Sequence, residues 1–328
     1  MPTISLDQIE DVTTSALMRH GAAEPVAKSV AHAVRVAEAN DNKICGLYYL
    51  ESYCTQLQTG RVLGDVTPRV SHDRPGSVCV DARFGFAQWA FAAGFDTAVE
   101  AARANGTCGY SIAHSHTCTS LGYFTEQFAE VGLLAIGSTN STARVSPPGG
   151  SVPVLGTNPM AMAVPGRDGQ VAFQFDYSTS AVALGKITMA AAADELIPRG
   201  WAVDADGNDT TDPHEALNGS LLSAGGYKGY GLGLMVEILA SALTGSLSST
   251  DIPPLKAPEG AHHDIGQFYL VIDPASFSGN SFFDHVDALR VAVEEQPGAR
   301  LPGAGRAVPE RVELEDAVWT SVLRLADA

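Results

Sequence analysis

The sequence has 328 residues, of which 45% are hydrophobic and 17% are charged, and its formal net charge is -17 at pH 7. This composition predicts a folded chain long enough for one large or two ordinary domains. The acidic balance argues against nucleic acids and anionic membrane surfaces as partners, because both attract basic proteins. A small anionic ligand stays compatible with it, since a local site can be positive on an acidic protein.

The N-terminus shows no basic segment followed by an apolar core, so no signal peptide is expected. No apolar run reaches the ~18 residues of a membrane span. The five cysteines are odd in number and have no paired spacing typical of a metal site, so reduced thiols in a cytoplasmic protein are expected. No metal is expected at residues 262–264 either, because neighbours on an extended chain point to opposite faces.

The first sixty residues predict three helices. The first follows a capping-box pattern at Ser5 and Gln8. The second is predicted over residues 24–39, with Pro25 in its first turn. The third is predicted over residues 48–57.

Further along the chain, short apolar runs alternate with longer helical patterns, which is typical of an α/β fold. Strands are predicted over residues 78–82, 110–113, 133–137, 159–164, 171–175, 201–203 and 267–272. Helices are predicted over residues 86–103, 121–130, 232–243, 283–295 and 312–325.

The most informative motif surrounds Lys228 with glycines, in the run GGYKGYG over residues 225–231, and an apolar run follows it. Glycine lets the backbone approach a ligand closely. A helix that begins at this point directs free N–H groups toward the same place. Together with the lysine, these groups predict a cradle for an anion such as a dinucleotide phosphate or a carboxylate. A loop that only packs a helix tightly is an equally weighted alternative.

This motif and three earlier stretches together resemble one family, the type-2 malate/L-lactate dehydrogenases. The earlier stretches are PGG at 148–150, LGTNP at 155–159 and DYSTSAVALGK at 176–186, and residues 198–204 and 301–303 agree as well. Members of this family are NAD(P)H-dependent reductases of 2-oxo acids and cyclic imino acids. The resemblance therefore implies an oxidoreductase that uses NADPH or NADH on a small-molecule substrate.

The resemblance also implies a fold other than the Rossmann fold. It implies an α/β architecture with an antiparallel-rich mixed sheet and flanking helices, and a helical part built from both chain ends. The boundaries it implies are residues 1–72, completed by residues 296–328, for the helical part, and residues 73–295 for the cofactor-binding domain. A homodimer with active sites near the subunit contact is implied as well.

Cofactor binding carries over, through the resemblance, to seven positions. Hydroxyl and amide side chains suit the nicotinamide carboxamide and the ribose, and lysines suit phosphate. A solvated surface charge is the alternative for Lys186. The seven positions are Ser138, Asn140, Gly156, Thr157, Lys186, Lys228 and Gly229.

The sequence departs from the family at the catalytic histidine. The family's Ser-His-Gly motif corresponds to Ile44-Cys45-Gly46, and Tyr49 stands where the family has an arginine. Reduction of a carbonyl needs a proton donor, a role that histidine fills near neutral pH. The Cys45 thiol, with a reference pKa of about 8.5, is a poor substitute. A small buried hydrophobic residue is the preferred interpretation of Cys45, with proton donation as the alternative.

These departures favour reduction of a carbon–nitrogen double bond, because an iminium nitrogen already carries its proton. Asp176, the acidic partner of the histidine in the family, is kept, and we expect it to hold the substrate nitrogen as a cation. His116 or Lys43 is expected to orient the substrate or relay protons. The His-Ser-His run that contains His114 and His116 resembles the piperideine- and pyrroline-carboxylate reductase branch.

Contacts to the substrate are expected from Tyr49, Arg144 and His114. Lys43 or Arg144 is expected to take over from the missing arginine, which would clamp a carboxylate in the family. A pair of strand-end histidines bonded to the backbone is the alternative interpretation of His114 and His116.

Three functions follow from the sequence. The first is an NAD(P)H-dependent reductase that transfers hydride to the C=N bond of a small cyclic imine or imino acid. The second is a 2-oxo acid/2-hydroxy acid dehydrogenase with a relocated proton donor. The third is a family member without reductase activity, which acts as a binding protein or runs different chemistry.

Overall fold

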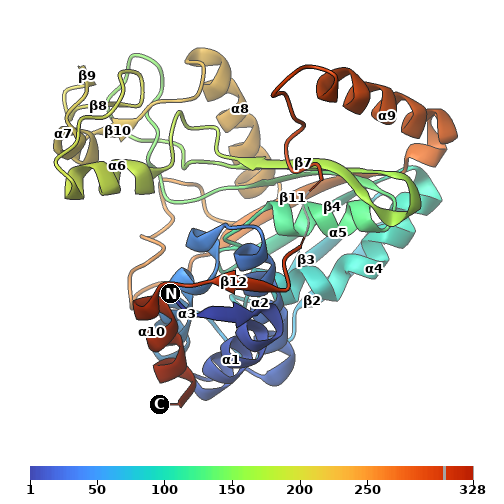
Figure 1. The fold of residues 1–328 in the computed structure, drawn as a ribbon, viewed down its shortest axis with the longest axis horizontal. Coiled ribbons are helices and arrows are strands. Elements are labelled where there is room, and N and C mark those ends of the chain that lie inside the picture. Colours follow the sequence, from blue (N-terminus) through green and yellow to red (C-terminus); the bar gives the residue numbers. More distant parts are fainter. Residues whose placement is uncertain (306–307, 328) are drawn as a thin grey trace.

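The computed structural model describes residues 1–305 and 308–327 (Figure 1). Its helices are α1 (Leu6–Arg19), α2 (Glu24–Ala39), α3 (Leu50–Gln58), α4 (Ala87–Asn105), α5 (Gly122–Glu130), α6 (Leu184–Ala192), α7 (Pro213–Asn218), α8 (Tyr227–Glu237), α9 (Asn280–Glu294) and α10 (Asp316–Asp327). Its strands are β1 (Thr3–Ser5), β2 (Arg69–Arg74), β3 (Ser77–Asp81), β4 (Thr107–Ser115), β5 (Leu134–Thr139), β6 (Met160–Pro165), β7 (Val171–Tyr177), β8 (Ala202–Val203), β9 (Asp209–Thr210), β10 (Ser220–Leu221), β11 (Ile265–Ile272) and β12 (Arg311–Glu313).

Seven strands form the main sheet, in the order β2-β3-β4-β11-β5-β6-β7. Within it β3 and β4 run parallel, and every other neighbouring pair is antiparallel. Helices α4 and α5 pack on this sheet, and Figure 1 shows α8 and α9 beyond its other side. The predicted antiparallel-rich mixed sheet with flanking helices is therefore confirmed.

The main core lies between the sheet and helices α4 and α5. Aromatic side chains fill it, with the ring centroids of Phe91 and Phe124 4.9 Å apart and those of Phe91 and Tyr269 5.4 Å apart. The buried Tyr110 hydroxyl donates a hydrogen bond of 2.6 Å to the carbonyl oxygen of Phe91, so its burial leaves no unpaired polar group. Val78 and Val271 complete the apolar surface on β3 and β11.

A second core joins the two ends of the chain. Strand β1 pairs with β12, with Ile4 opposite Val312, and α10 packs against α1. Leu314 and Val322 from the C-terminal end are buried among the N-terminal helices. The division into residues 1–72 plus 296–328 and residues 73–295 stays a prediction, and residues 306, 307 and 328 of that division lie outside the described part.

Local signals predicted the N-terminal helices well. Ser5 caps α1 and accepts a hydrogen bond of 3.2 Å from the backbone N–H of Gln8. Helix α2 has the predicted bounds, with Pro25 at its start. The third helix is split, because a 3-10 turn at Leu47–Tyr49 precedes α3.

The predicted first residue was wrong for two helices. The helix predicted over 312–325 begins only at Asp316, because residues 311–313 form β12 and pair with β1. The helix predicted over 232–243 begins at Tyr227 as α8 and continues as a π-helical turn, Ile238–Ala242. Gly229 and Gly231 of the motif therefore lie inside the helix, whereas Gly225 and Gly226 precede it.

One satellite layer was predicted only in part. Helices α6 and α7 and the small sheet β10-β8-β9 surround a third apolar cluster that includes Ile187 and Leu221. Strand β8 was predicted within residues 201–203, whereas α6, α7, β9 and β10 were missed. The five cysteines are all free in the structure, and none of the helices in the described ranges is long and apolar enough to cross a membrane.

Candidate functional site

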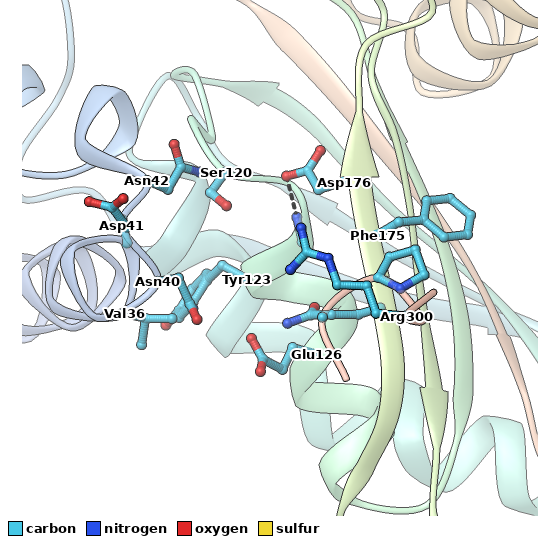
Figure 2. Close-up of a pocket in the computed structure, with 15 residues that line it drawn as sticks. Val36, Asn40, Asp41, Asn42, Ser120, Tyr123, Glu126, Phe175, Asp176 and Arg300 are labelled. Atoms are coloured by element: carbon cyan, nitrogen blue, oxygen red, sulfur yellow. Dashed lines mark hydrogen bonds between the residues drawn. The ribbon is translucent and has the colours of Figure 1, made fainter. Parts of the chain in front are cut away.

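Two pockets are lined by residues that flank, in the sequence, the segment that replaces the histidine motif: residues 40–42 line the first, and Tyr49 lines the second. The first, of about 580 Å³, is lined by the carboxylates of Asp41, Glu126 and Asp176, and we call it the acidic pocket. Figure 2 shows it between α2, the start of α5 and strand β7, with Arg300 from the loop after α9 on its wall. The pocket therefore suits a ligand that carries positive charge at its Asp176 end.

Asp176 is held in place by the start of α5. Its Oδ2 accepts a hydrogen bond of 2.8 Å from the backbone N–H of Gly122. A methyl group on Gly122 would lie 3.1 Å from the Asp176 Cβ, so the close approach favours glycine. The carboxylate also faces the positive end of the α5 dipole.

Burial raises the pKa of Asp176, although the side chain opens onto the pocket. Hydrogen bonds from the backbone N–H groups of Gly122 and Leu121 and from the Ser120 side chain oppose this rise, because they stabilise the ionised form. The local structure therefore supports, with three hydrogen-bond donors, a carboxylate that is open to the pocket.

Cys45 lies at the end of the 3-10 turn Lys43–Cys45, between Asn42, which lines the acidic pocket, and Tyr49, which lines the second pocket, in the sequence. Burial is the main cause that raises the pKa of its thiol to about 12, and the Asp176 charge adds to the rise. A hydrogen bond to Asn42 and the charge of Lys256 act in the opposite direction. The thiol is thus protonated at neutral pH and is too weak an acid to replace an imidazolium.

The packing around Gly46, which follows Cys45, leaves no room for a side chain. The buried Glu38 Oε1 accepts a hydrogen bond of 2.7 Å from the backbone N–H of Leu47. A Cβ on Gly46 would overlap that same oxygen. This contact explains why Gly46 persists although the histidine beside it does not.

The second pocket, of about 490 Å³, carries two cations, and we call it the cationic pocket. It brings together Tyr49, Arg144 and Thr157, which the sequence assigned separately to substrate and cofactor. Lys256 also lines it, from the loop before β11. Its Nζ lies 4.0 Å from the centroid of the Tyr48 ring and 5.4 Å from that of Tyr49. Sequence analysis missed Lys256, because nothing in the run IPPLKAP distinguishes its lysine from a surface charge.

The other predicted catalytic and substrate side chains do not line either pocket. His116 is only 1% exposed, and its Nε2 lies 2.6 Å from the Oε1 of Gln56. His114 pairs with Asp264, with 2.8 Å between Nδ1 and Oδ1. Lys43 is exposed and forms an ion pair of 3.5 Å with Asp41. Among the described residues that line the acidic pocket or the second pocket, none is His116, His114 or Lys43.

Two predicted cofactor residues, Ser138 on β5 and Asn140 just after it, are buried. Asn140 donates from Nδ2 to the carbonyl oxygen of Leu247 at 2.9 Å, while its buried Oδ1 has no hydrogen-bond partner in the structure. Ser138 donates to the carbonyl oxygen of Phe268 at 3.2 Å. The unpaired amide oxygen fits a ligand that brings an N–H donor, such as a carboxamide.

Residues 156 and 157 approach neighbouring backbone closely. The backbone N–H of Thr157 donates to Ser141 Oγ at 3.2 Å, and a Cβ on Gly156 would overlap the Ser141 carbonyl oxygen. Thr179 connects this stretch to the glycine motif, because its N–H donates to Thr157 O at 2.9 Å and its carbonyl accepts from Ala224 N at 2.9 Å. The backbone of Thr157 is therefore linked through Thr179 to Ala224, which lies just before the start of α8.

The glycine motif has features of both predicted interpretations, a tightly packed helix start and a cradle for an anion. Gly229 packs a helix tightly, since a Cβ there would overlap the carbonyl oxygen of Ala224. Gly225 and Gly226 have φ angles of 68° and 66° and open space where side chains would stand. Lys228 follows them in the first turn of α8 and is exposed, so the free helix N–H groups and a lysine are presented together.

Lys186 is exposed on α6, and within the described ranges neither Lys186 nor Lys228 forms an ion pair. The residues present therefore fit a dinucleotide cofactor: hydroxyls and an unpaired amide oxygen at one end, and a glycine-rich helix start with lysine at the other.

Glu237, which the sequence did not indicate, ties these parts together. Its carboxylate accepts hydrogen bonds from Asn158 Nδ2 at 2.8 Å and from the backbone N–H and side chain of Ser249 at 2.7 and 2.6 Å. It also accepts from Asn140 Nδ2 at 3.5 Å. The sequence offers one signal for it, a single glutamate inside the apolar run LGLMVEILA at residues 232–240, but its contacts appear only in the folded chain.

Comparisons with known proteins agree with this architecture. The model of the malate/L-lactate dehydrogenase family matches residues 4–319. The chain belongs to the malate/L-lactate dehydrogenase family.

Two relatives and one solved structure show the range of this similarity. The chain is 39% identical to the (2R)-3-sulfolactate dehydrogenase (NADP(+)) of Chromohalobacter salexigens, over 96% of this chain and 95% of the relative. It is 36% identical to the Delta(1)-pyrroline-2-carboxylate/Delta(1)-piperideine-2-carboxylate reductase of Pseudomonas aeruginosa, over 93% and 92%. The structure of the delta1-piperideine-2-carboxylate reductase of Pseudomonas syringae pv. tomato superposes with a TM-score of 0.92 at 33% identity, covering 99% of this chain and all of that one.

Membership of the malate/L-lactate dehydrogenase family makes the departures at Cys45 and Tyr49 more informative. They occur inside a fold that is otherwise preserved over the whole chain. The segment around them keeps its glycine, its contact with Glu38 and its place beside Asp176.

Proposed function

We propose that this protein is an NAD(P)H-dependent reductase of the carbon–nitrogen double bond in small cyclic imino acids. The observation that carries the proposal is the pairing of Asp176 with Cys45. The site offers a supported carboxylate for an iminium cation, but the neighbouring thiol is too weak an acid to protonate an alkoxide. Relatives named as pyrroline- and piperideine-2-carboxylate reductases support the same substrate class.

The chemistry follows from the charge of the substrate. A protonated cyclic imine places its positive nitrogen next to the ionised Asp176, which stabilises that cation and orients the ring. When bound, a reduced nicotinamide supplies the hydride that the carbon accepts. The nitrogen keeps the proton it already carries and becomes a neutral amine, so no protein acid has to act in this step.

The cofactor is NADPH or NADH, and its binding residues are those that the family resemblance implied. Asn140 and Ser138 suit the nicotinamide end, and the start of α8 with Lys228 suits phosphate. A relative named as NADP(+)-dependent supports this assignment. Calorimetry with each nucleotide, on the wild type and on Lys228→Met, tests it.

A second function is a 2-oxo acid dehydrogenase with a relocated proton donor. The relative named (2R)-3-sulfolactate dehydrogenase, at 39% identity, favours it. In such an enzyme another donor must replace the histidine, and the buried, neutral His116 does not suit that role in its present position.

The deciding experiment follows the absorbance of reduced nicotinamide with a panel of substrates. We expect turnover with 1-pyrroline-2-carboxylate and 1-piperideine-2-carboxylate. Turnover of 2-oxo acids without imine reduction would reverse the order of the two functions. Failure to bind either nucleotide would favour the third alternative, a family member that has lost the reductase activity.

A homodimer in the cytoplasm completes the proposal. Helix α8 and the following π-helical turn expose large apolar side chains, including Tyr227 at 72% and Ile238 at 59%. A second copy of the chain would cover them, as the family resemblance implies. The free cysteines fit a reducing compartment. Light scattering after gel filtration measures the oligomeric state.

A further inference from the structure

The loop that presents Lys256 is fixed from beneath by two buried polar side chains. Gln56, on α3, donates from Nε2 to the carbonyl oxygens of Leu255 and Ala257, both at 2.8 Å. Arg61, which is 1% exposed, donates to the carbonyl oxygens of Pro254 and Ala257. The backbone is therefore held on both sides of Lys256, which is unusual for a residue on a surface loop.

The orientation of Gln56 depends in turn on His116. Because the Gln56 amide nitrogen donates to two carbonyls, its Oε1 can only accept, and the His116 Nε2 lies 2.6 Å from it. His116 must then carry its proton on Nε2. Its buried Nδ1 has no partner, and its ring stacks on His263 at a centroid distance of 4.0 Å. Histidine, glutamine and loop form one continuous buried connection.

Lys256 brings an unpaired charge to the cationic pocket. Within the described ranges, neither Lys256 nor Arg144 forms an ion pair, although the chain carries a net charge of -17. The charges of Lys256 and Asp176 both act on the Cys45 thiol, in opposite directions, so the cation and the carboxylate lie near the same residue. A small ligand with a positive and a negative group therefore has an opposite charge close by for each of them.

We propose that Lys256 binds the carboxylate of the substrate and that His116 is a positioning residue, which fixes the Lys256 loop through Gln56. The inference rests on the proposed function and deepens it. The substrate is a cyclic imino acid whose iminium nitrogen faces Asp176 and whose carboxylate faces Lys256. Lysine on the loop thus replaces the arginine that Tyr49 displaced.

The first test compares two substrates that differ only in the carboxylate, 1-pyrroline-2-carboxylate and 1-pyrroline. Lys256→Met should lower kcat/KM for the carboxylated substrate by about ten- to a hundredfold, as expected for one charge-assisted hydrogen bond. The same variant should leave 1-pyrroline within about twofold. Lys28→Met, which removes a surface lysine paired with Glu24, is the matched control and should change neither value. Equal loss on both substrates, or no loss, would overturn the role of Lys256.

The second test separates positioning from simple packing at His116. His116→Phe should raise KM for 1-pyrroline-2-carboxylate with little change in kcat, and should leave 1-pyrroline unaffected. His116→Gln can place an amide N–H where the Nε2–H stood, and it should restore much of the KM. Thermal unfolding of both variants identifies loss of the fold. An equal effect of Phe and Gln, or an effect on both substrates, would refute the positioning role.

A binding measurement keeps this inference distinguishable from the proposed function. Calorimetric titration with pyrrole-2-carboxylate needs no turnover, and Lys256→Met should weaken this binding about ten- to a hundredfold. If the wild type reduces no imine but this binding depends on Lys256, the reductase function fails and the carboxylate site stands. If the wild type reduces imines and Lys256→Met binds the probe as tightly as the wild type does, the carboxylate site fails alone.

Discussion

The backbone N–H of Gly122 donates a hydrogen bond of 2.8 Å to the Oδ2 of Asp176. The contact joins the first residue of α5 to the end of β7. Strand β7 belongs to the main sheet, and α5 packs on that sheet. Asp176 is therefore placed by secondary structure rather than by a flexible loop. A site built this way holds its geometry without a bound ligand.

The pH dependence of imine reduction reports on this support. Burial raises the pKa of Asp176 above its ordinary value of 3.8, so activity should fall as the pH drops through a point above 3.8. Ser120 hydrogen-bonds to the carboxylate and lowers that pKa, so Ser120→Ala should move the loss of activity to higher pH. Profiles of kcat/KM against pH measure the shift. A Ser120→Ala profile displaced to lower pH would contradict this account of Asp176.

Restoring the family histidine should restore carbonyl chemistry. Cys45→His places an imidazole near Asp176, which can orient it and favour its charged form. We expect reduction of 2-oxo acids to rise by about 10²–10⁴-fold, the usual contribution of a general acid. Cys45→Ser, which is similar in size but no better as an acid, is the control. Equal gains in the two variants would show that the cysteine is not what limits oxo-acid reduction.

Gly46 should tolerate no side chain. Gly46→Ala would push the Glu38 carboxylate from its hydrogen bond to Leu47 and leave a buried polar group unpaired, so we expect a loss of about 1–3 kcal/mol in the free energy of unfolding. Gly76→Ala is the matched control, because Gly76 has open space at its Cβ. Urea denaturation compares them, and equal stabilities would refute the steric argument.

Thiol labelling should separate one cysteine from the rest. Cys79 on β3 is exposed, whereas Cys54, Cys108 and Cys118 are buried. Burial also raises the pKa of Cys45 to about 12, which keeps its nucleophilic thiolate scarce. A thiol reagent such as DTNB should therefore show one fast phase, which Cys79→Ser removes. A fast phase that persists in this variant would place another reactive thiol at the surface.

The sequence predicted most of the long elements because their signals are local. The bounds of α2 follow from its apolar periodicity and from Pro25, and the start of α1 follows from the Ser5 cap. Strand β12 was mistaken for helix because its partner β1 lies about three hundred residues earlier, as the pairing of Ile4 with Val312 shows. Pairing over such a distance leaves no local pattern.

The site was predictable to a different extent. Tyr49, Arg144 and Thr157 line one pocket. The family resemblance, not spacing, selected Tyr49 and Thr157, and Arg144 was selected as a replacement for the missing arginine. Lys256 and Glu237 escaped notice, because their importance comes from contacts that only folding creates. His116 was singled out for its chemistry, whereas its burial could not be inferred from the residues around it.

The pairing of β1 with β12 determines when the protein can finish folding. The strand that completes the N-terminal helices comes about three hundred residues after them in the chain, and Leu314 and Val322 bury apolar surface in the same core. During synthesis these helices must therefore wait, partly assembled, until residues 311–322 have left the ribosome. A chain cut before β12 would leave apolar surface exposed on its N-terminal helices.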